Sequence, residues 1–375
     1  MAALAPLPAA DPAADPAADP AAGRSAPEFH PLTVAAVDRL CADAVALTFV
    51  VPPPLLPAYA FRAGQSLTLR RIVDGVEHRR SYSICAPAGS APRIGVRQIP
   101  GGLFSSWLVR DVRPGMSIEV GTPTGRWRAD PSRGERHLGV AAGSGITPVL
   151  SVAATVLAHP QAAMSLLYGN RTSRTVMFAE ELADLKNRYP ARLQLVQVLS
   201  REPRDVELLS GRLDAGRLRR LLTDVVPVEV FDHVWLCGPW RMVQDAREVL
   251  TALGVSPQRV HVELFHVEAP PPRPRRPAPA VAGATTRLTT VLQGRRTMST
   301  VARGTTLLAS ARAARGDVPF ACTGGVCGTC RALVRDGEVD LRRNYALEPA
   351  ELDAGFVLTC QSFPLSDQVT LDYDA

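Results

Sequence analysis

The feature that most constrains this chain is a group of four cysteines near its C-terminus. Cys322, Cys327 and Cys330 follow a C-x4-C-x2-C pattern, and Cys360 lies farther along. This is the plant-type ligand spacing for a 2Fe-2S cluster. Three thiolates from one short segment must converge on a small cluster, so the residues between them have to form a tight loop. The pattern therefore predicts a 2Fe-2S centre with these four cysteines as metal ligands.

Glycines between the cysteines support this interpretation. Gly324, Gly325 and Gly328 lack a Cβ atom, so they reach positive φ and let backbone N–H groups approach the sulfur atoms. The alternatives are a zinc site or disulfides. Zinc sites usually carry paired C-x2-C motifs, and disulfides do not suit the cytosol. Loop glycines, ligand spacing and the distant fourth cysteine together favour the cluster.

The length of 375 residues is enough for two or three domains. Of the seven cysteines, the three outside the cluster motif are Cys41, Cys85 and Cys237. They are scattered and odd in number, which argues against a disulfide framework. The first residues lack the basic and apolar regions of a secretory signal. We therefore expect a cytoplasmic protein.

The net charge of +6 raises the question of nucleic-acid binding. The arginines are dispersed, however, and residues 285–375 carry ten Arg against ten Asp plus Glu. Binding to nucleic acid requires clustered positive charge. Residues 138–158 are nearly uncharged over the length of a membrane span, but Gly143, Gly145 and Pro148 interrupt them. We expect neither nucleic acid nor a membrane as a partner.

The first third of the chain separates into a tail and a β-rich region. Residues 1–27 repeat Asp-Pro-Ala-Ala in a segment dominated by Ala and Pro, so we predict a disordered tail. Short β-branched segments then alternate with Pro and Gly turns, which is typical of a small antiparallel barrel. The predicted strands are Leu32–Val37, Val45–Val51, Ser66–Ile72, Arg80–Cys85, Arg93–Gln98 and Ser117–Val120.

A polar motif lies on the fourth of these strands. Alternation sends Arg80 and Tyr82 to one face of the strand and Ser81 and Ser83 to the other. An aromatic ring beside a cation suits an isoalloxazine ring next to a phosphate. Taken alone the motif is weak, because Tyr and Arg on a strand usually serve packing and solvation.

A second motif runs from Arg97 through a double glycine into an apolar helix start. Gly102 and Ser105 lie at this turn, where free N–H groups and a serine make an anion site. The alternative is a Pro-Gly turn in which Ser105 or Ser106 caps the helix. Because both motifs occur at this separation, we include Arg97, Gly102 and Ser105 among the expected cofactor-binding residues.

Together the Arg-x-Tyr-Ser strand and the Gly-x-x-Ser turn resemble the flavin-binding barrel of the ferredoxin-NADP reductase superfamily. The resemblance implies that Arg80, Gly102 and Ser105 hold the pyrophosphate of FAD. It also implies that Tyr82 stacks on the flavin ring and that Ser83 lies near flavin N5.

A glycine turn follows the next apolar strand. Gly143 and Gly145 precede a predicted helix with Thr147 as its cap and Pro148 at its first position. A turn of this kind cradles phosphate at a helix N-terminus. Gly-x-Gly after a strand is a weak signal by itself. However, Ala-Gly-Ser-Gly-Ile-Thr-Pro resembles the nicotinamide-domain signature of the same superfamily, which implies that Gly143, Gly145 and Thr147 bind the cofactor.

Strands and helices then alternate, which predicts a doubly wound parallel sheet with ligands at the carboxyl ends of its strands. The resemblance implies that Ser200 and Arg201 hold the 2′-phosphate of NADPH and that Cys237 borders the nicotinamide. The predicted elements are strands Met164–Tyr168, Leu193–Leu199, His233–Cys237 and Val260–Phe265, and helices Phe178–Arg188, Gly216–Leu222 and Arg241–Leu253. The expected cofactor-binding residues here are Arg171, Ser200, Arg201, Arg212, Cys237, Gly238 and Pro239.

Residues 268–284 contain six prolines and predict an extended linker. Residues 285–375 resemble a plant-type ferredoxin of β-grasp form, with predicted strands Thr286–Leu292 and Arg295–Val301 and a helix Leu307–Arg315. The strings at 342–348 and 355–362, together with the domain order, resemble the reductase subunits of phenylacetyl-CoA epoxidase complexes.

These features predict a multi-domain β and α/β protein. Its parts are a tail (1–27), an FAD-binding barrel (28–134), an NAD(P)H-binding domain (135–267), a linker (268–284) and a ferredoxin domain (285–375). The resemblance implies a reductase that passes electrons from NADPH through FAD and the cluster to a diiron oxygenase component. Ser83 and Cys237 are its expected catalytic residues. Reductases of Rieske or other hydroxylases, and a non-catalytic electron carrier, remain open alternatives.

Overall fold

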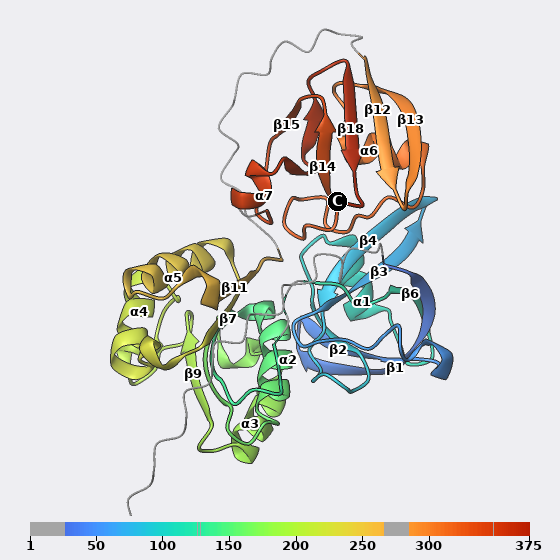
Figure 1. Cartoon of the computed structure of the whole chain (residues 1–375). Coiled ribbons are helices and arrows are strands. Elements are labelled where there is room, and N and C mark those ends of the chain that lie inside the picture. The colour runs from blue at the N-terminus through green and yellow to red at the C-terminus, as the bar shows by residue number, and fades with distance from the viewer. Residues whose placement is uncertain (1–26, 126, 128, 266–284, 348) are drawn as a thin grey trace, which may run out of the picture.

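The computed structural model describes residues 27–125, 127, 129–265, 285–347 and 349–375. The predicted tail, apart from residue 27, and the predicted Pro-rich linker lie outside these residues. Figure 1 shows three bodies: a blue barrel, a green-to-yellow α/β domain beside it and an orange-to-red domain above the barrel. The sequence-based fold class is confirmed: each predicted strand and helix is present, with ends displaced by a few residues.

The first body is a six-stranded antiparallel sheet with the order β4-β3-β6-β1-β2-β5. A bridge between Ile84 and Ile94 joins the two outer strands and closes the sheet into a barrel. Inward-facing apolar side chains and helix α1 fill its interior. The elements are β1 Phe29–Cys41, β2 Ala44–Val50, β3 Ser66–Val73, β4 Val76–Ser83, β5 Arg93–Arg97, α1 Leu103–Arg110 and β6 Ser117–Gly121.

The second body is a five-stranded parallel sheet with the order β11-β10-β7-β8-β9. Helices α2 and α3 contribute to the core on one face, and α4 and α5 to the core on the other, so the sheet is doubly wound. Its elements are β7 Arg136–Ala142, α2 Ile146–Val156, β8 Ala163–Asn170, α3 Ala179–Arg188, β9 Leu193–Leu199, α4 Ala215–Arg220, β10 His233–Cys237, α5 Trp240–Ala252 and β11 Val260–Glu263.

The start of helix α2 differs from the prediction. Thr147 is not its cap: the helix begins at Ile146 and its N-cap is Gly145. The preceding turn, Gly143–Gly145, is already wound as a 3-10 helix, so the helical path starts earlier than the proline suggested. The Thr147 hydroxyl instead donates to the carbonyl oxygen of Ser144 at 3.0 Å.

The third body is a mixed five-stranded sheet, β13-β12-β18-β14-β16, with a small β15-β17 pair and the packed helix α6. The parallel pairing of β12 with β18, flanked by antiparallel neighbours, agrees with the predicted β-grasp form. Its elements are β12 Thr285–Leu292, β13 Arg295–Ala302, α6 Leu307–Ala314, β14 Arg331–Asp336, β15 Val339–Leu341, α7 Pro349–Asp353, β16 Phe356–Leu358, β17 Ser362–Pro364 and β18 Gln368–Asp372.

The third body contacts both others. In Figure 1 the β3–β4 hairpin of the barrel reaches up to its orange strands. Phe320 lies under the guanidinium of Arg79 from β4, and the ring of Tyr345 meets Trp240 of α5 edge to face at 5.2 Å. The cysteine loop between α6 and β14 therefore lies next to both the barrel and the α/β domain.

Candidate functional site

The four predicted cluster ligands lie in two pairs. Cys322 is paired with Cys327, and Cys330 with Cys360, and within each pair the thiols interact through a hydrogen bond. That bond lowers the pKa of Cys322 and of Cys360 below the usual range for a thiol and raises the pKa of their partners Cys327 and Cys330. Thiolates are the form that binds iron. A 2Fe-2S cluster contains two irons, and each iron is bound by two thiolates, so these four cysteines fit such a cluster.

Backbone N–H groups of the loop point at one of these sulfurs. The amides of Gly324 and Cys327 each approach the Cys322 sulfur at 3.4 Å. Gly325 and Gly328 have φ of +81° and +69°, the left-handed conformation that the tight loop requires. Among the described residues, no group of three or more His, Cys, Asp or Glu is arranged around a single metal ion.

The predicted flavin strand is β4, the outer strand that pairs with β3. Arg80 is exposed, and its guanidinium donates to the carbonyl oxygen of Arg79 at 2.7 Å. The ring of Tyr82 lies 6.3 Å from that of Phe104 on α1. Ser83, the last residue of the strand, is buried. The ring of Tyr82 therefore lies beside α1, and the exposed Arg80 precedes it by two residues on the same strand.

The predicted Gly-x-x-Ser turn forms the start of helix α1. Gly102 is the N-cap, and the buried hydroxyl of Ser105 accepts from the Ile99 N–H at 3.1 Å. A Cβ atom on Gly102 would lie 2.7 Å from the Ser105 hydroxyl oxygen, so only glycine fits there. The serine thus fixes the turn, and Gly102 leaves room for close backbone approach at a helix N-terminus.

Ser83 meets the sheet of the α/β domain. Its hydroxyl donates to Glu263, the last residue of β11, at 3.0 Å. Glu263 lies beside the buried Cys237 in the parallel β10–β11 register. Burial raises the pKa of Glu263 to about 8 and raises the pKa of the Cys237 thiol well above its usual value. Both groups are therefore neutral at pH 7, and no charge opposes the approach of an apolar ring.

The sequence analysis placed Glu263 within the predicted strand Val260–Phe265 and gave it no role. Its second carboxyl oxygen is buried and has no hydrogen-bond partner among the described residues. The available signal was an acidic residue at the end of a strand, in a sheet whose strand ends are expected to bind ligands. A buried polar atom without a partner is unusual and marks a place where a ligand atom fits.

The glycine turn before α2 packs directly against the end of β10. A Cβ atom on Gly145 would overlap the carbonyl group of Cys237, and one on Gly238 would crowd Ala142. Gly143 has a φ of +56° and faces the guanidinium of Arg97. Pro239 is the N-cap of α5 in an extended conformation. The turn is thus a backbone-lined surface beside Ser83 and Glu263, suited to phosphate or to a flat ring.

The remaining predicted nucleotide residues lie together at the ends of β8 and β9. The Ser200 N–H donates to the Asn170 carbonyl oxygen and the Arg201 N–H to that of Arg171, which sets these two arginines side by side. Arg201 is exposed. Gly211, just before Arg212, donates to the carbonyl oxygen of Leu199. The sequence prediction that these residues gather on one sheet edge is consistent with this arrangement.

Two predicted cofactor-binding arginines have protein partners. Arg97 contacts Asp43 and donates to the carbonyl oxygen of Thr175, and Arg171 pairs with the same Asp43 at 3.0 Å. Asp43 lies in the β1–β2 turn of the barrel, whereas Thr175 and Arg171 belong to the α/β domain. Both arginines therefore join the two domains, a role that their sequence motifs did not indicate.

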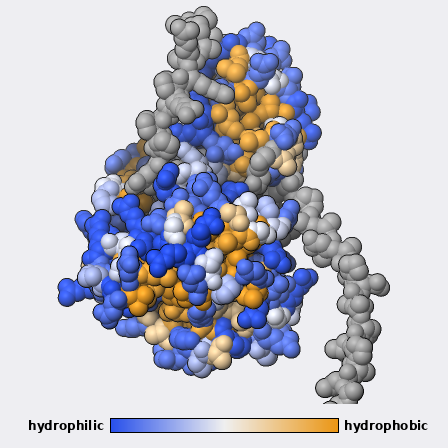
Figure 2. Space-filling model, turned by 90° about the vertical axis from the view of Figure 1, so that its left-hand side faces the viewer, coloured by the Kyte–Doolittle hydropathy of each residue, from blue (hydrophilic) through white to orange (hydrophobic). Residues whose placement is uncertain are grey.

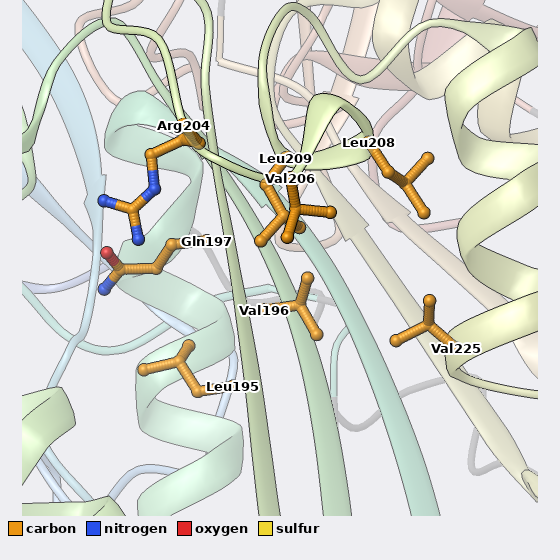
Figure 3. Close-up of a pocket in the computed structure, with 8 residues that line it drawn as sticks. All are labelled: Leu195, Val196, Gln197, Arg204, Val206, Leu208, Leu209 and Val225. Carbon is orange, nitrogen blue, oxygen red and sulfur yellow. The ribbon is translucent and has the colours of Figure 1, made fainter.

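A hollow lies elsewhere in the α/β domain. It borders the outer strand β9 and includes none of the predicted cofactor-binding residues (Figure 3). Val206 and Val225 beside it are exposed apolar residues, and Figure 2 shows apolar surface on this side of the molecule. We place the candidate site at Ser83, Glu263 and Cys237, where buried polar groups converge. The hollow is lined by Leu195, Val196, Gln197, Arg204, Val206, Leu208, Leu209 and Val225.

Family models match three consecutive parts of the chain. An oxidoreductase FAD-binding domain matches residues 31–129, an oxidoreductase NAD-binding domain matches 140–248, and a 2Fe-2S iron-sulfur cluster binding domain matches 290–365. Each model covers the body in which the corresponding motif lies. These matches and the reductase relatives described next make the chain an NAD(P)H-dependent oxidoreductase.

Two curated relatives extend over nearly the whole chain. A subunit of the 1,2-phenylacetyl-CoA epoxidase of Escherichia coli is 43% identical over 92% of this chain and 98% of its own. The ferredoxin reductase component of 3-ketosteroid-9-alpha-monooxygenase from Rhodococcus rhodochrous is 31% identical over 91% of this chain and 96% of its own. Both belong to oxygenase systems of several components.

A solved structure shares the complete fold. Phthalate dioxygenase reductase aligns with a TM-score of 0.60 at 24% identity, over 92% of this chain and 98% of that one. No helix in the described part of the chain has the length and apolarity to cross a bilayer. The chain belongs to the ferredoxin-NADP reductase superfamily, in the group that joins an FAD-binding barrel, an NAD-binding domain and a C-terminal 2Fe-2S domain.

Proposed function

We propose that this protein is the cytoplasmic reductase component of a diiron oxygenase, and that it takes electrons from NADPH. The observation that carries the proposal is the meeting of Ser83, Glu263 and Cys237 at the junction of the flavin barrel and the nucleotide domain, with the cysteine loop seated against both. Electrons entering at this junction have a short path to the cluster. We also propose that the domains have the boundaries predicted from the sequence.

The barrel residues are assigned to FAD. Arg80 and the turn at Gly102 and Ser105 hold the pyrophosphate, and Tyr82 packs on the flavin ring. Ser83 faces flavin N5, where its hydroxyl is oriented by the acceptor Glu263 at 3.0 Å. When bound, FAD supplies the conversion between hydride transfer and one-electron transfer. The chain's own contribution is positioning and the exclusion of water.

The α/β residues are assigned to NADPH. The turn at Gly143 and Gly145 and the strand end at Gly238 and Pro239 form the cradle for the pyrophosphate and nicotinamide, with Cys237 bordering the ring. Thr147 stabilises the turn through Ser144. The adenosine end lies at Ser200 and Arg201, where a guanidinium can bind the 2′-phosphate. Arg171 and Arg212 flank that end.

The partner is inferred from the relative with 43% identity, which is named as a subunit of 1,2-phenylacetyl-CoA epoxidase. We propose that this chain reduces the diiron component of such an epoxidase, which acts on phenylacetyl-CoA. The predicted function of the cysteine domain is to deliver single electrons to it. We propose that the thioester binds to the oxygenase component and not to this chain.

Reconstitution tests this function. The purified reductase, carrying FAD and its cluster, is mixed with the epoxidase components, NADPH, oxygen and phenylacetyl-CoA. Formation of the epoxide, dependent on the reductase, is the expected result. If the epoxidase components stay inactive while a Rieske oxygenase is reduced rapidly by the same preparation, the partner is wrong. If NADPH fails to bleach the flavin, the protein is an electron carrier and not a reductase.

A further inference from the structure

A compact set of charged and aromatic residues joins the flavin barrel to the cysteine domain. On the barrel side are Glu77 and Arg79 of β4, and on the other side are Arg312 of α6 and Phe320. The guanidinium carbons of Arg79 and Arg312 lie 4.4 Å and 3.8 Å from the Phe320 ring centroid. Glu77 forms an ion pair with each side: its Oε1 is 3.0 Å from the Arg79 Nε atom and 3.5 Å from the Arg312 guanidinium. We call these four residues the clamp.

The clamp is a buried contact between domains and not an incidental surface contact. Phe320 and Arg79 are buried, at 3% and 5% exposure, although both lie at a boundary between domains. Arg79 is also 4.9 Å from the Phe29 ring, so its guanidinium contacts one aromatic ring from each domain. A guanidinium over an aromatic ring is attracted by the ring quadrupole, and more strongly when water is excluded.

The clamp connects the two predicted redox sites along the chain. Arg79 immediately precedes Arg80, and Tyr82 and Ser83 follow on the same strand. Phe320 lies two positions before Cys322, the first cluster ligand. On the opposite side of the loop, Tyr345 contacts Trp240 and donates its N–H to the Gly325 carbonyl oxygen at 3.0 Å. The cysteine loop is thus fixed from both neighbouring domains.

We propose that the clamp is a docking device that positions the cysteine domain for electron transfer from the flavin. The inference rests on the proposed function. For each NADPH oxidised, two electrons cross this boundary one at a time, each reduces an oxidised cluster by one electron, and one proton is released to solvent. Electron transfer through protein slows steeply with distance, so loosening the clamp slows this step and leaves hydride transfer unchanged.

The test uses the full-length holoprotein with Arg312→Gln, and Arg296→Gln as the matched control. Arg296 lies exposed on β13 of the same domain. In anaerobic rapid mixing with NADPH, flavin bleaching should keep the wild-type rate in both variants. Cluster reduction should slow about tenfold in Arg312→Gln and stay unchanged in Arg296→Gln. Raising the salt concentration should slow cluster reduction in wild type but have less effect in Arg312→Gln.

A double-mutant cycle separates the clamp from a general structural effect. Glu77→Gln should slow cluster reduction as well, and the double variant should be no slower than the worse single variant, because both remove the same contact. Additive effects, or wild-type cluster reduction in Arg312→Gln, would overturn the proposal.

Hydrogen exchange gives a readout that does not depend on redox activity. Amides at 318–321 and on β4 should exchange faster in Arg312→Gln than in the control, and equal exchange rates would contradict docking by this residue. If wild-type protein shows flavin bleaching without cluster reduction, the proposed function fails. The exchange comparison still decides whether the clamp docks the domain.

Discussion

Glu263 is the residue at which the chemistry of the site is most unusual. Its carboxyl group lies at the end of β11, beside Cys237 at the end of the neighbouring strand β10. Among the described residues, it accepts a hydrogen bond from the Ser83 hydroxyl at 3.0 Å. Burial disfavours the charged form, so the carboxyl stays protonated to about pH 8. A neutral carboxylic acid can accept from Ser83 and still present an O–H to a ligand.

The raised pKa of Glu263 makes folding stability depend on pH in a definite direction. The folded-state pKa of about 8 lies above the ordinary value of 4.5, so the folded chain holds more protons between these pH values. This contribution to stability is complete below pH 4.5 and is lost as the pH rises towards 8, by at most about 1.4 kcal/mol per pH unit. Glu263→Gln keeps an acceptor for Ser83 but cannot ionise.

Calorimetric unfolding at a series of pH values from mildly acidic to mildly alkaline would check this dependence. The unfolding midpoint of Glu263→Gln, relative to wild type, should rise steadily across the series. His137 provides an internal contrast: burial lowers its pKa to about 4, so its contribution is lost as pH falls from 6.5 to 4. A constant difference between the two proteins would show that the Glu263 carboxyl is not protonated in the folded state.

Arg201 is the residue expected to select the coenzyme. Its side chain is exposed just beyond the end of β9, and its backbone N–H donates to the Arg171 carbonyl oxygen. Arg201→Ala should raise the KM for NADPH about tenfold or more, with little change for NADH, because a guanidinium–phosphate contact is charge-assisted. Steady-state kinetics with both coenzymes measures the effect. Arg204→Ala, three positions on, is the control, and equal losses for both coenzymes would contradict the assignment.

At the scale of elements, the site depends on backbone approach between the glycine turn and the end of β10. Gly145→Ala would place a methyl group on the Cys237 carbonyl group, and this backbone group cannot readily move away. We expect a loss of about 1–3 kcal/mol in stability of the α/β domain and weakened NADPH binding. Thermal unfolding and coenzyme titration would measure both. Gly304→Ala, in open space, should be neutral.

Elements were predictable from the sequence where the signal is local. Alternating β-branched segments and Gly or Pro turns located the barrel strands, and the βα succession located the parallel sheet. Element ends were less accurate. The strand expected from Arg80 starts at Val76, because the Asp74–Gly75 turn pairs β4 with β3 along its full length. The helix cap was wrongly predicted at Thr147 because the turn before α2 is itself helical.

Contacts between distant segments could not be predicted from the sequence. The Ser83–Glu263 hydrogen bond joins residues in different domains, and so does the contact of Glu77 with Arg312. Neither pair has a spacing or composition that identifies it. Such contacts are set by how finished domains pack, whereas the cysteine motif is set by the geometry of one loop.

At the scale of the whole molecule, the three bodies form a series. The nucleotide domain meets the barrel at Ser83 and Glu263, and the barrel meets the cysteine domain at the clamp. The core on one face of the parallel sheet also contains barrel residues, whereas the core of the cysteine domain contains residues of that domain alone. This separate core implies that the cysteine domain can lose its function while the other two bodies stay folded.

The modular arrangement leads to a prediction for Cys322→Ser. Removing one of the four ligands should abolish cluster assembly, since the remaining three thiolates leave one iron incompletely held. The barrel and nucleotide domain keep their cores, so flavin binding should persist. NADPH-driven reduction of ferricyanide, which takes electrons from the flavin, should stay near the wild-type rate, whereas electron delivery to an oxygenase should disappear. Iron analysis, flavin content and the two activities measure these outcomes.

Cys85→Ser, in the barrel and away from the cluster loop, is the control that should keep both iron and electron delivery. If Cys322→Ser loses ferricyanide reduction as well as the cluster, the bodies depend on one another for folding. The cysteine domain would then be needed to maintain the flavin site as well as to accept electrons from it.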